Sequence, residues 1–368
     1  MAGCATPKPP PIPRTGDPVV DDKAEMRRAP QRDRVLWEYR IAAAAMRQGR
    51  YDVAKQELDD ALGTIGGIIA NDKNAKRARS LFHEEARKTF LGEPYERVMA
   101  YFYRGILYWM DGEPDNARAC FRSGQLEDSD TEHKQYAGDY VLLDYLDGLA
   151  TVKLGGDGSD AFKRAQSRSK FNLPPYDPKA NVLVFVEFGH GPTKFATGPY
   201  HEELRFQLGH SQALSARVTV ENQSALAEPY DDLNYQATTR GGRVMDHILA
   251  NKAVFKSTTD TAGNVGLIGG AVLATDRDTQ DIGLGLLAAG LISKLFSAAT
   301  TPAADVRAWD NLPLYLGFVA LRLPPGPHIA TVEFLDPGGR PIANRTKTVT
   351  IDVSAVDKDT VVFVSDQA

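Results

Sequence analysis

Cysteine is nearly absent from this chain: of its 368 residues, only Cys4 and Cys120 carry a thiol. Two thiols cannot build a disulfide framework or a multi-thiolate metal site. A bridge between the two is not expected, because Cys4 lies in a proline-rich tail. Cys120 stands beside Phe121 in a helical pattern, which is typical of a small core residue.

Long apolar runs and positive charge are also lacking. No uninterrupted run of about 18 or more apolar residues occurs, so we expect no conventional membrane-spanning helix. The formal net charge is -5 and the pI is about 5.9. A general nucleic-acid binder needs a basic surface to neutralise phosphates, so we expect no nucleic-acid partner. The basic stretch 73–79 is typical of a solvated helix face.

Familiar catalytic and cofactor motifs are missing as well. None of the seven histidines belongs to a His-Glu-x-x-His zinc motif, and neither a Gly-x-Ser-x-Gly elbow nor a phosphate-binding glycine loop occurs. We therefore expect no metal, no cofactor and no enzymatic activity. One alternative stays open: Glu187, His190, Lys194 and His201 surround a loop after a predicted strand, where an enzyme could place its site. The other interpretation of this loop, which we favour, is a structural turn.

Small residues precede the first cysteine, in the order Met1-Ala2-Gly3-Cys4. This stretch resembles the end of a bacterial lipobox, in which the cysteine thiol receives a diacylglycerol. No charged or apolar signal segment precedes it in this sequence, so we expect that segment to be absent or truncated here. Residues 5–14 contain five prolines, which favour an extended spacer between a membrane and a folded domain. We predict lipidation at Cys4, with the outer membrane as the destination.

Residues 31–172 show the apolar spacing of helices joined by glycine-containing turns. Two segments repeat one arrangement, in which a small residue near one helix end is followed twelve positions later by another. The pairs are Ala42 with Ala54 and Gly105 with Ala117, and a weaker copy starts at Gly148. The pattern resembles tetratricopeptide repeats, whose paired helices approach closely at such small residues. We predict divergent helical hairpins that bind a protein partner on a concave surface.

Aromatic side chains are frequent in this helical half. Four of them are candidates for partner binding: Tyr101, Tyr108, Trp109 and Tyr140. The alternative for each ring is packing between helices, which is the more frequent role of a single aromatic residue.

Residues 178–368 contain β patterns separated by proline and glycine turns. We expect strands at 181–188, 204–208, 216–221, 315–322, 329–335, 346–353 and 360–364. Ala330, Val332 and Phe334 alternate with polar neighbours, as in a half-buried antiparallel strand. These strands predict a β-sandwich-like domain. Before the strand at 315–322, Asp305 and Arg307 are expected to form an ion pair beside a buried Trp309.

An unusual insert interrupts the strands at 261–301. We expect this insert to form two apolar helices. Each carries small residues at every fourth position, a spacing that allows helices to approach closely. The stripe residues are Gly266, Gly270, Ala274, Gly285, Ala289 and Ser293. We predict that this hairpin drives self-association. Packing on the β-rich domain and insertion into a membrane remain alternatives, although both helices are shorter than the roughly 20 residues that cross a bilayer.

Several stretches together resemble an uncharacterised family of bacterial tetratricopeptide-like envelope lipoproteins. They are Gly92-Glu93-Pro94-Tyr95-Glu96-Arg97, Asp139-Tyr140 with Asp144-Tyr145, Phe188-Gly189-His190-Gly191-Pro192, and residues 304–313 around Trp309. The resemblance covers nearly the whole chain. It implies placement in a Gram-negative envelope and implies no particular activity.

The sequence thus predicts an α+β protein of two domains. A lipobox remnant and linker (1–30) precede a helical repeat domain (31–172) and a β-rich domain (178–368). We expect a lipid-anchored scaffold that binds a protein partner in the cell envelope and forms homo-oligomers. The alternatives are a structural subunit of a ring, tube or filament, and an enzyme using the loop around His190.

Overall fold

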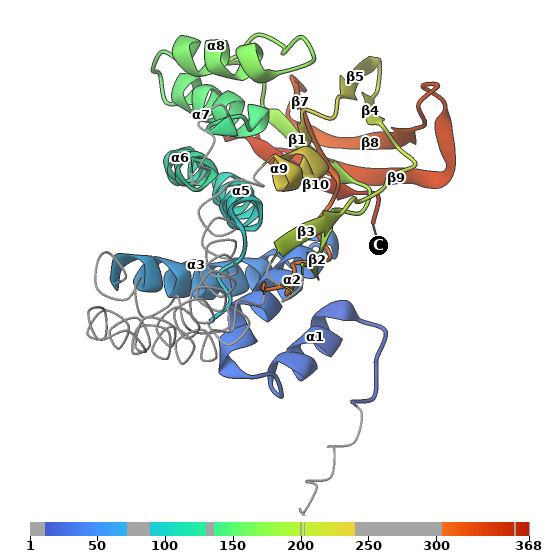
Figure 1. Ribbon diagram of the computed structural model, residues 1–368. Coiled ribbons are helices and arrows are strands. Elements are labelled where there is room, and N and C mark those ends of the chain that lie inside the picture. Colours follow the sequence, from blue (N-terminus) through green and yellow to red (C-terminus); the bar gives the residue numbers. More distant parts are fainter. Residues whose placement is uncertain are drawn as a thin grey trace, which may run out of the picture.

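The computed structural model describes residues 12–71, 89–129, 136–198, 201, 203–239, 304–356 and 358–367. Helices occupy the first part of this chain and strands most of the second (Figure 1). The predicted α+β class is therefore confirmed. Cys4 and the insert 261–301 lie outside the described residues, so lipidation and self-association stay predictions. No helix in the described part is long and apolar enough to cross a membrane.

Consecutive helices pack against each other, α1 with α2, α2 with α3, α5 with α6, α6 with α7, and α7 with α8. Prolines begin α1, α5 and α6, where a missing N–H leaves no helical hydrogen bond unmade. The helices of this half are α1 (Pro18–Met26), α2 (Arg34–Arg47), α3 (Tyr51–Asn71), α5 (Pro94–Asp111), α6 (Pro114–Asp128), α7 (Val141–Lys153) and α8 (Ser159–Arg168), with a 3-10 turn at Gln31–Asp33.

Glycine permits the close approach within two of these pairs. A Cβ atom placed on Gly105 would lie 2.6 Å from Cε1 of Phe121, which belongs to the partner helix α6. A Cβ atom on Gly148 would lie 2.9 Å from the Cβ of Ala161 in α8. Both distances are shorter than van der Waals contact. The expectation that small residues stand where the paired helices meet is therefore confirmed at these positions.

The strands form two four-stranded sheets and one hairpin. The central sheet has the order β10-β1-β7-β6, with β1 parallel to β10 and antiparallel to β7. The outer sheet has the order β5-β4-β8-β9 and is antiparallel throughout. The bounds are β1 (Val182–Phe188), β2 (Thr193–Thr197), β3 (Glu203–Gln207), β4 (Ser215–Val220), β5 (Gln223–Ala227), β6 (Asp231–Asp232), β7 (Tyr315–Leu321), β8 (Gly326–Leu335), β9 (Pro341–Val353) and β10 (Thr360–Ser365), with the short helix α9 (Leu233–Thr238) after β6.

The central sheet is covered on both faces, and β1 shows this most clearly. All seven of its residues are buried. Leu183 and Phe185 belong to the core shared with the helices, whereas Val182, Val184 and Val186 belong to the core shared with the outer sheet. Figure 1 shows the same order of layers, with helices on one side of β1 and β10 and the strands β4, β8 and β9 on the other.

The inner face of the helices packs directly against the central sheet. Phe102 of α5 meets Phe185 of β1 edge-on, at 6.1 Å between ring centroids. Tyr145 of α7 lies 5.8 Å from Phe318 of β7. Helices and central sheet therefore share one continuous apolar core. The face on which we expected a concave groove for a partner is, at these contacts, filled by the chain's own strands.

Candidate binding cavity

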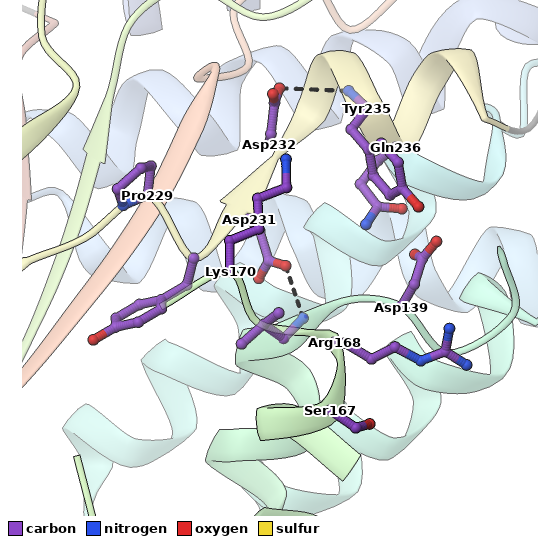
Figure 2. A pocket seen from close by; sticks show the side chains of 11 residues that line it. Asp139, Ser167, Arg168, Lys170, Pro229, Asp231, Asp232, Tyr235 and Gln236 are labelled. Atoms are coloured by element: carbon purple, nitrogen blue, oxygen red, sulfur yellow. Dashed lines mark hydrogen bonds between the residues drawn. The ribbon is translucent and has the colours of Figure 1, made fainter. Parts of the chain in front are cut away.

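A cavity of about 300 Å³ opens where the start of α7, the end of α8 and the segment β6-α9 meet (Figure 2). Asp139 and Val141 contribute from the start of α7. The end of α8 and the turn after it contribute Ser167, Arg168 and Lys170. The opposite wall consists of Pro229, Tyr230, Asp231, Asp232, Tyr235 and Gln236. The volume lies at the lower end of the range for small-molecule sites.

Two adjacent carboxylates fix the helices that border this cavity. Asp231 accepts hydrogen bonds from the backbone N–H groups of Val141 (2.8 Å) and Leu142 (2.9 Å), at the first turn of α7. Asp232 accepts from the N–H groups of Asn234 (2.9 Å) and Tyr235 (3.4 Å), at the first turn of α9. Such N–H groups have no partner inside their helix, and they carry the positive end of the helix dipole. The two carboxylates therefore position both walls.

Burial changes the acidity of the carboxyl groups here. Desolvation raises the pKa of Asp231 to about 7, although its two backbone donors favour the charged form. Desolvation also raises the pKa of Asp139 to about 6, opposed by hydrogen bonds from Gln236 and Tyr235 and by the positive charge of Arg168. The pKa of Asp232 is raised in the same direction, mainly by burial, and Lys170 opposes that shift.

Cations and an aromatic ring complete the lining. The Lys170 ammonium lies 5.9 Å from the ring centroid of Tyr235. Tyr235 is 40% exposed, and Tyr136 meets its edge with 6.4 Å between centroids. Figure 2 shows Asp139 and Arg168 on one side of the cavity and Asp231 and Asp232 on the other. The site thus presents hydrogen-bond acceptors, donors and one open ring around a small space.

This arrangement can bind a small polar molecule and can exchange protons near neutral pH. A carboxyl group with a pKa of about 6 in a cavity is typical of functional sites, although structural networks also shift pKa values. Within the described part of the chain, no group of three or more histidine, cysteine or acidic side chains could hold a metal ion. The described residues of this site offer hydrogen bonding and, through Asp139, proton exchange.

The residues around His190 are not gathered into one polar pocket, which was the alternative to a structural turn. Glu187 is buried and accepts hydrogen bonds from Arg47 Nε (2.6 Å) and the Tyr103 hydroxyl (2.5 Å). The Lys194 ammonium forms a buried ion pair with Glu96 in α5. His190 is exposed and faces the ring of His210 at 5.3 Å. The structure thus engages Glu187 and Lys194 in two separate contacts with the helices.

The four aromatic candidates for partner binding divide into two pairs. Trp109 and Tyr140 are 1% and 2% exposed and belong to the core. Tyr101 and Tyr108 are partly exposed and stand two helical turns apart on α5. The guanidinium of Arg104 lies 3.6 Å from the centroid of the Tyr108 ring. We call Tyr101, Arg104 and Tyr108 the α5 stripe.

The expected ion pair near Trp309 is present. Arg307 Nε donates to Asp305 at 2.8 Å, and Trp309 is fully buried. The indole stacks on Tyr39 at 4.3 Å between ring centroids. Through Trp309 this segment packs on α2, and its predicted structural role is confirmed.

Sequence reasoning missed the cavity and the carboxylates that line it. Asp232 stands directly before an apolar helical stretch, which is a helix N-cap signal that could have marked α9. Asp231 gave no such signal, because its partners lie about 90 positions earlier in the chain. A search of family models, of curated proteins and of solved structures found no match to this chain.

Proposed function

We propose that the protein is a lipid-anchored scaffold of the bacterial cell envelope that binds a protein partner. The proposal combines the Ala-Gly-Cys motif at Cys4 with an α+β body whose helices and central sheet share one core. We interpret the three helical hairpins as divergent tetratricopeptide-like repeats and the two stacked sheets as a β-sandwich-like unit. Close helix contacts at Gly105 and Gly148 support the first interpretation, and the antiparallel pairing of the outer sheet supports the second.

The α5 stripe is the observation that carries the partner-binding part. Tyrosine and arginine are enriched among the residues that dominate protein interfaces. Tyr101 and Tyr108 remain partly exposed, and Arg104 is held in place by Asp59 at 2.7 Å and by the Tyr108 ring. A pre-positioned guanidinium loses little side-chain entropy when a partner binds. The stripe lies between neighbouring helices: Arg104 pairs with Asp59 of α3, and Tyr101 lies beside Gly124 of α6.

Lipidation of Cys4 is the first expected result. In cells expressing the chain behind a lipoprotein signal segment, a radiolabelled or alkyne-bearing fatty acid should label the protein, and Cys4→Ser should abolish the label. The Cys120→Ser variant is the matched control and should be labelled like the wild type. An unlabelled wild-type protein recovered from the cytosol would contradict the placement in the envelope.

A partner at the α5 stripe is the second expected result. A photo-crosslinking amino acid at position 101 or 108 should give one defined crosslinked product in intact cells. The same amino acid at Leu226, which is 42% exposed on β5, serves as the control position. Arg104→Gln should weaken the product by several-fold at both stripe positions. Equal products from the stripe and from position 226 would argue that the stripe has no special role.

A further inference from the structure

The cavity at α7, α8 and α9 carries nearly balanced charge. Arg168 and Lys170 supply two positive charges, and three carboxyl groups face them. Asp139 and Asp231 titrate at about 6 and about 7, so near neutral pH each is protonated for part of the time. The positive and negative charges of the lining therefore nearly cancel. A cavity of this kind selects poorly for a ligand with a net charge.

The lining of the cavity offers both hydrogen-bond donors and hydrogen-bond acceptors in high number. Carboxylate oxygens accept, protonated carboxyl groups donate as well as accept, and guanidinium and ammonium groups donate. The amide of Gln236 adds both kinds of group to the same space. A ligand that satisfies such a lining carries several groups that are donors and acceptors at once, as hydroxyl groups are.

One ring gives the cavity an apolar platform. Tyr235 is 40% exposed at the lining and is fixed by the capping of α9 and by the edge of Tyr136. Three further residues with apolar surface, Val141, Pro229 and Tyr230, lie in the same lining. The C–H face of a sugar ring packs on an aromatic ring, while its hydroxyl groups reach planar polar side chains. Glycine, acetate and tetramethylammonium carry no alcohol hydroxyl groups and no ring that could stack on Tyr235.

We infer that this cavity is a saccharide-binding site, with Tyr235 as the stacking ring and Asp139, Asp232, Lys170 and Gln236 as hydrogen-bonding groups to the sugar hydroxyls. The volume of about 300 Å³ accommodates a single sugar ring of a glycan. The inference does not depend on the proposed protein partner, because the cavity and the α5 stripe are separate sets of residues.

Saturation-transfer NMR on the purified full chain tests this inference. The probes are the methyl glycosides of glucose, galactose and N-acetylglucosamine at millimolar concentration. Glycine, acetate and tetramethylammonium are the charged comparators. At least one glycoside should receive saturation from the protein, and the three comparators should not.

Variants locate the binding. Tyr235→Ala should weaken the glycoside by about tenfold, which corresponds to about 1.4 kcal/mol of ring contact. Tyr235→Phe should bind within about threefold of the wild type, because the ring remains. Lys170→Gln should weaken binding by several-fold, and Ile329→Ala, an exposed residue of β8 that is not part of the lining, should leave it unchanged. Asp232→Asn keeps a cap on α9, so it tests the carboxylate with less risk to folding.

Three outcomes would overturn the inference. No saturation transfer to any glycoside with a folded wild-type protein is the first. Unchanged binding by a folded Tyr235→Ala variant is the second, because the sugar would then bind elsewhere. Transfer to the charged comparators alone is the third, and it would identify an ionic ligand instead. None of these outcomes affects the crosslinking at the α5 stripe.

Discussion

Replacing Glu187 with alanine is expected to lower the free energy of unfolding by about 3–5 kcal/mol, the range for breaking a buried ion pair from one side. The side chains of Glu187 and Arg47 are 1% and 4% exposed, and the Tyr103 hydroxyl donates to the second carboxylate oxygen. Removal of the carboxylate leaves a buried guanidinium without its counter-charge. Urea denaturation at a fixed pH measures the loss.

A double-variant cycle separates the ion pair from ordinary packing. Arg47→Met combined with Glu187→Leu should be less destabilising than either single variant, because no buried charge is left alone. Glu333→Gln is the matched control, since its ion pair with Arg217 lies on the surface of the outer sheet. Surface pairs contribute about 0–1 kcal/mol. Additive losses for the two buried residues would show that they do not act as a pair.

Stability is expected to fall as the pH rises from 5 to 8, and Asp231 is the main titrating group that we hold responsible. Its pKa is about 7 in the folded protein and near 3.8 when exposed. The folded state therefore binds the proton more tightly than the unfolded state, and the stabilisation present at low pH disappears as the pH passes 7. For this one group, the loss between pH 5 and pH 8 is about 2–3 kcal/mol.

Asp231→Asn isolates this effect, because asparagine has the same shape and does not titrate. The variant should lose less stability than the wild type between pH 5 and 8, even if one hydrogen bond to α7 is weakened at every pH. Asp336→Asn is the control, since the pKa of Asp336 is lowered and the group does not titrate in this window. Denaturant midpoints measured every half pH unit give the slopes. Parallel curves for wild type and Asp231→Asn would refute the assignment.

Much of the secondary structure could be predicted from local sequence. The alternation through Ala330, Val332 and Phe334 correctly located β8, because one face of that strand is buried against the central sheet. The unbroken apolar run at 182–186 also indicated the order of layers. A strand without alternation is buried on both faces, and β1 is indeed covered by the helices and by the outer sheet.

The same apolar run could have indicated that a strand covers the inner face of the helices. Trp109 and Tyr140 were candidates for a binding surface because aromatic residues occur both at interfaces and in cores, and local pattern does not separate the two. Their burial depends on strands that follow much later in the chain. For the same reason the cavity could not be found, since Asp231 reaches its partners on α7 across about 90 positions.

The edge strand β10 has a consequence for how the molecule is made. It pairs in parallel with β1, and directly before it Asp359 accepts hydrogen bonds from Trp109, 250 positions earlier, and from Lys153. During synthesis, the helical hairpins emerge long before this strand, and Phe102, Tyr103 and Tyr145 have no sheet to cover them. Long-range pairing of this kind slows folding, and it leaves aggregation-prone apolar surface exposed until the pairing is complete. The newly made chain thus keeps this apolar surface uncovered until β10 has been made.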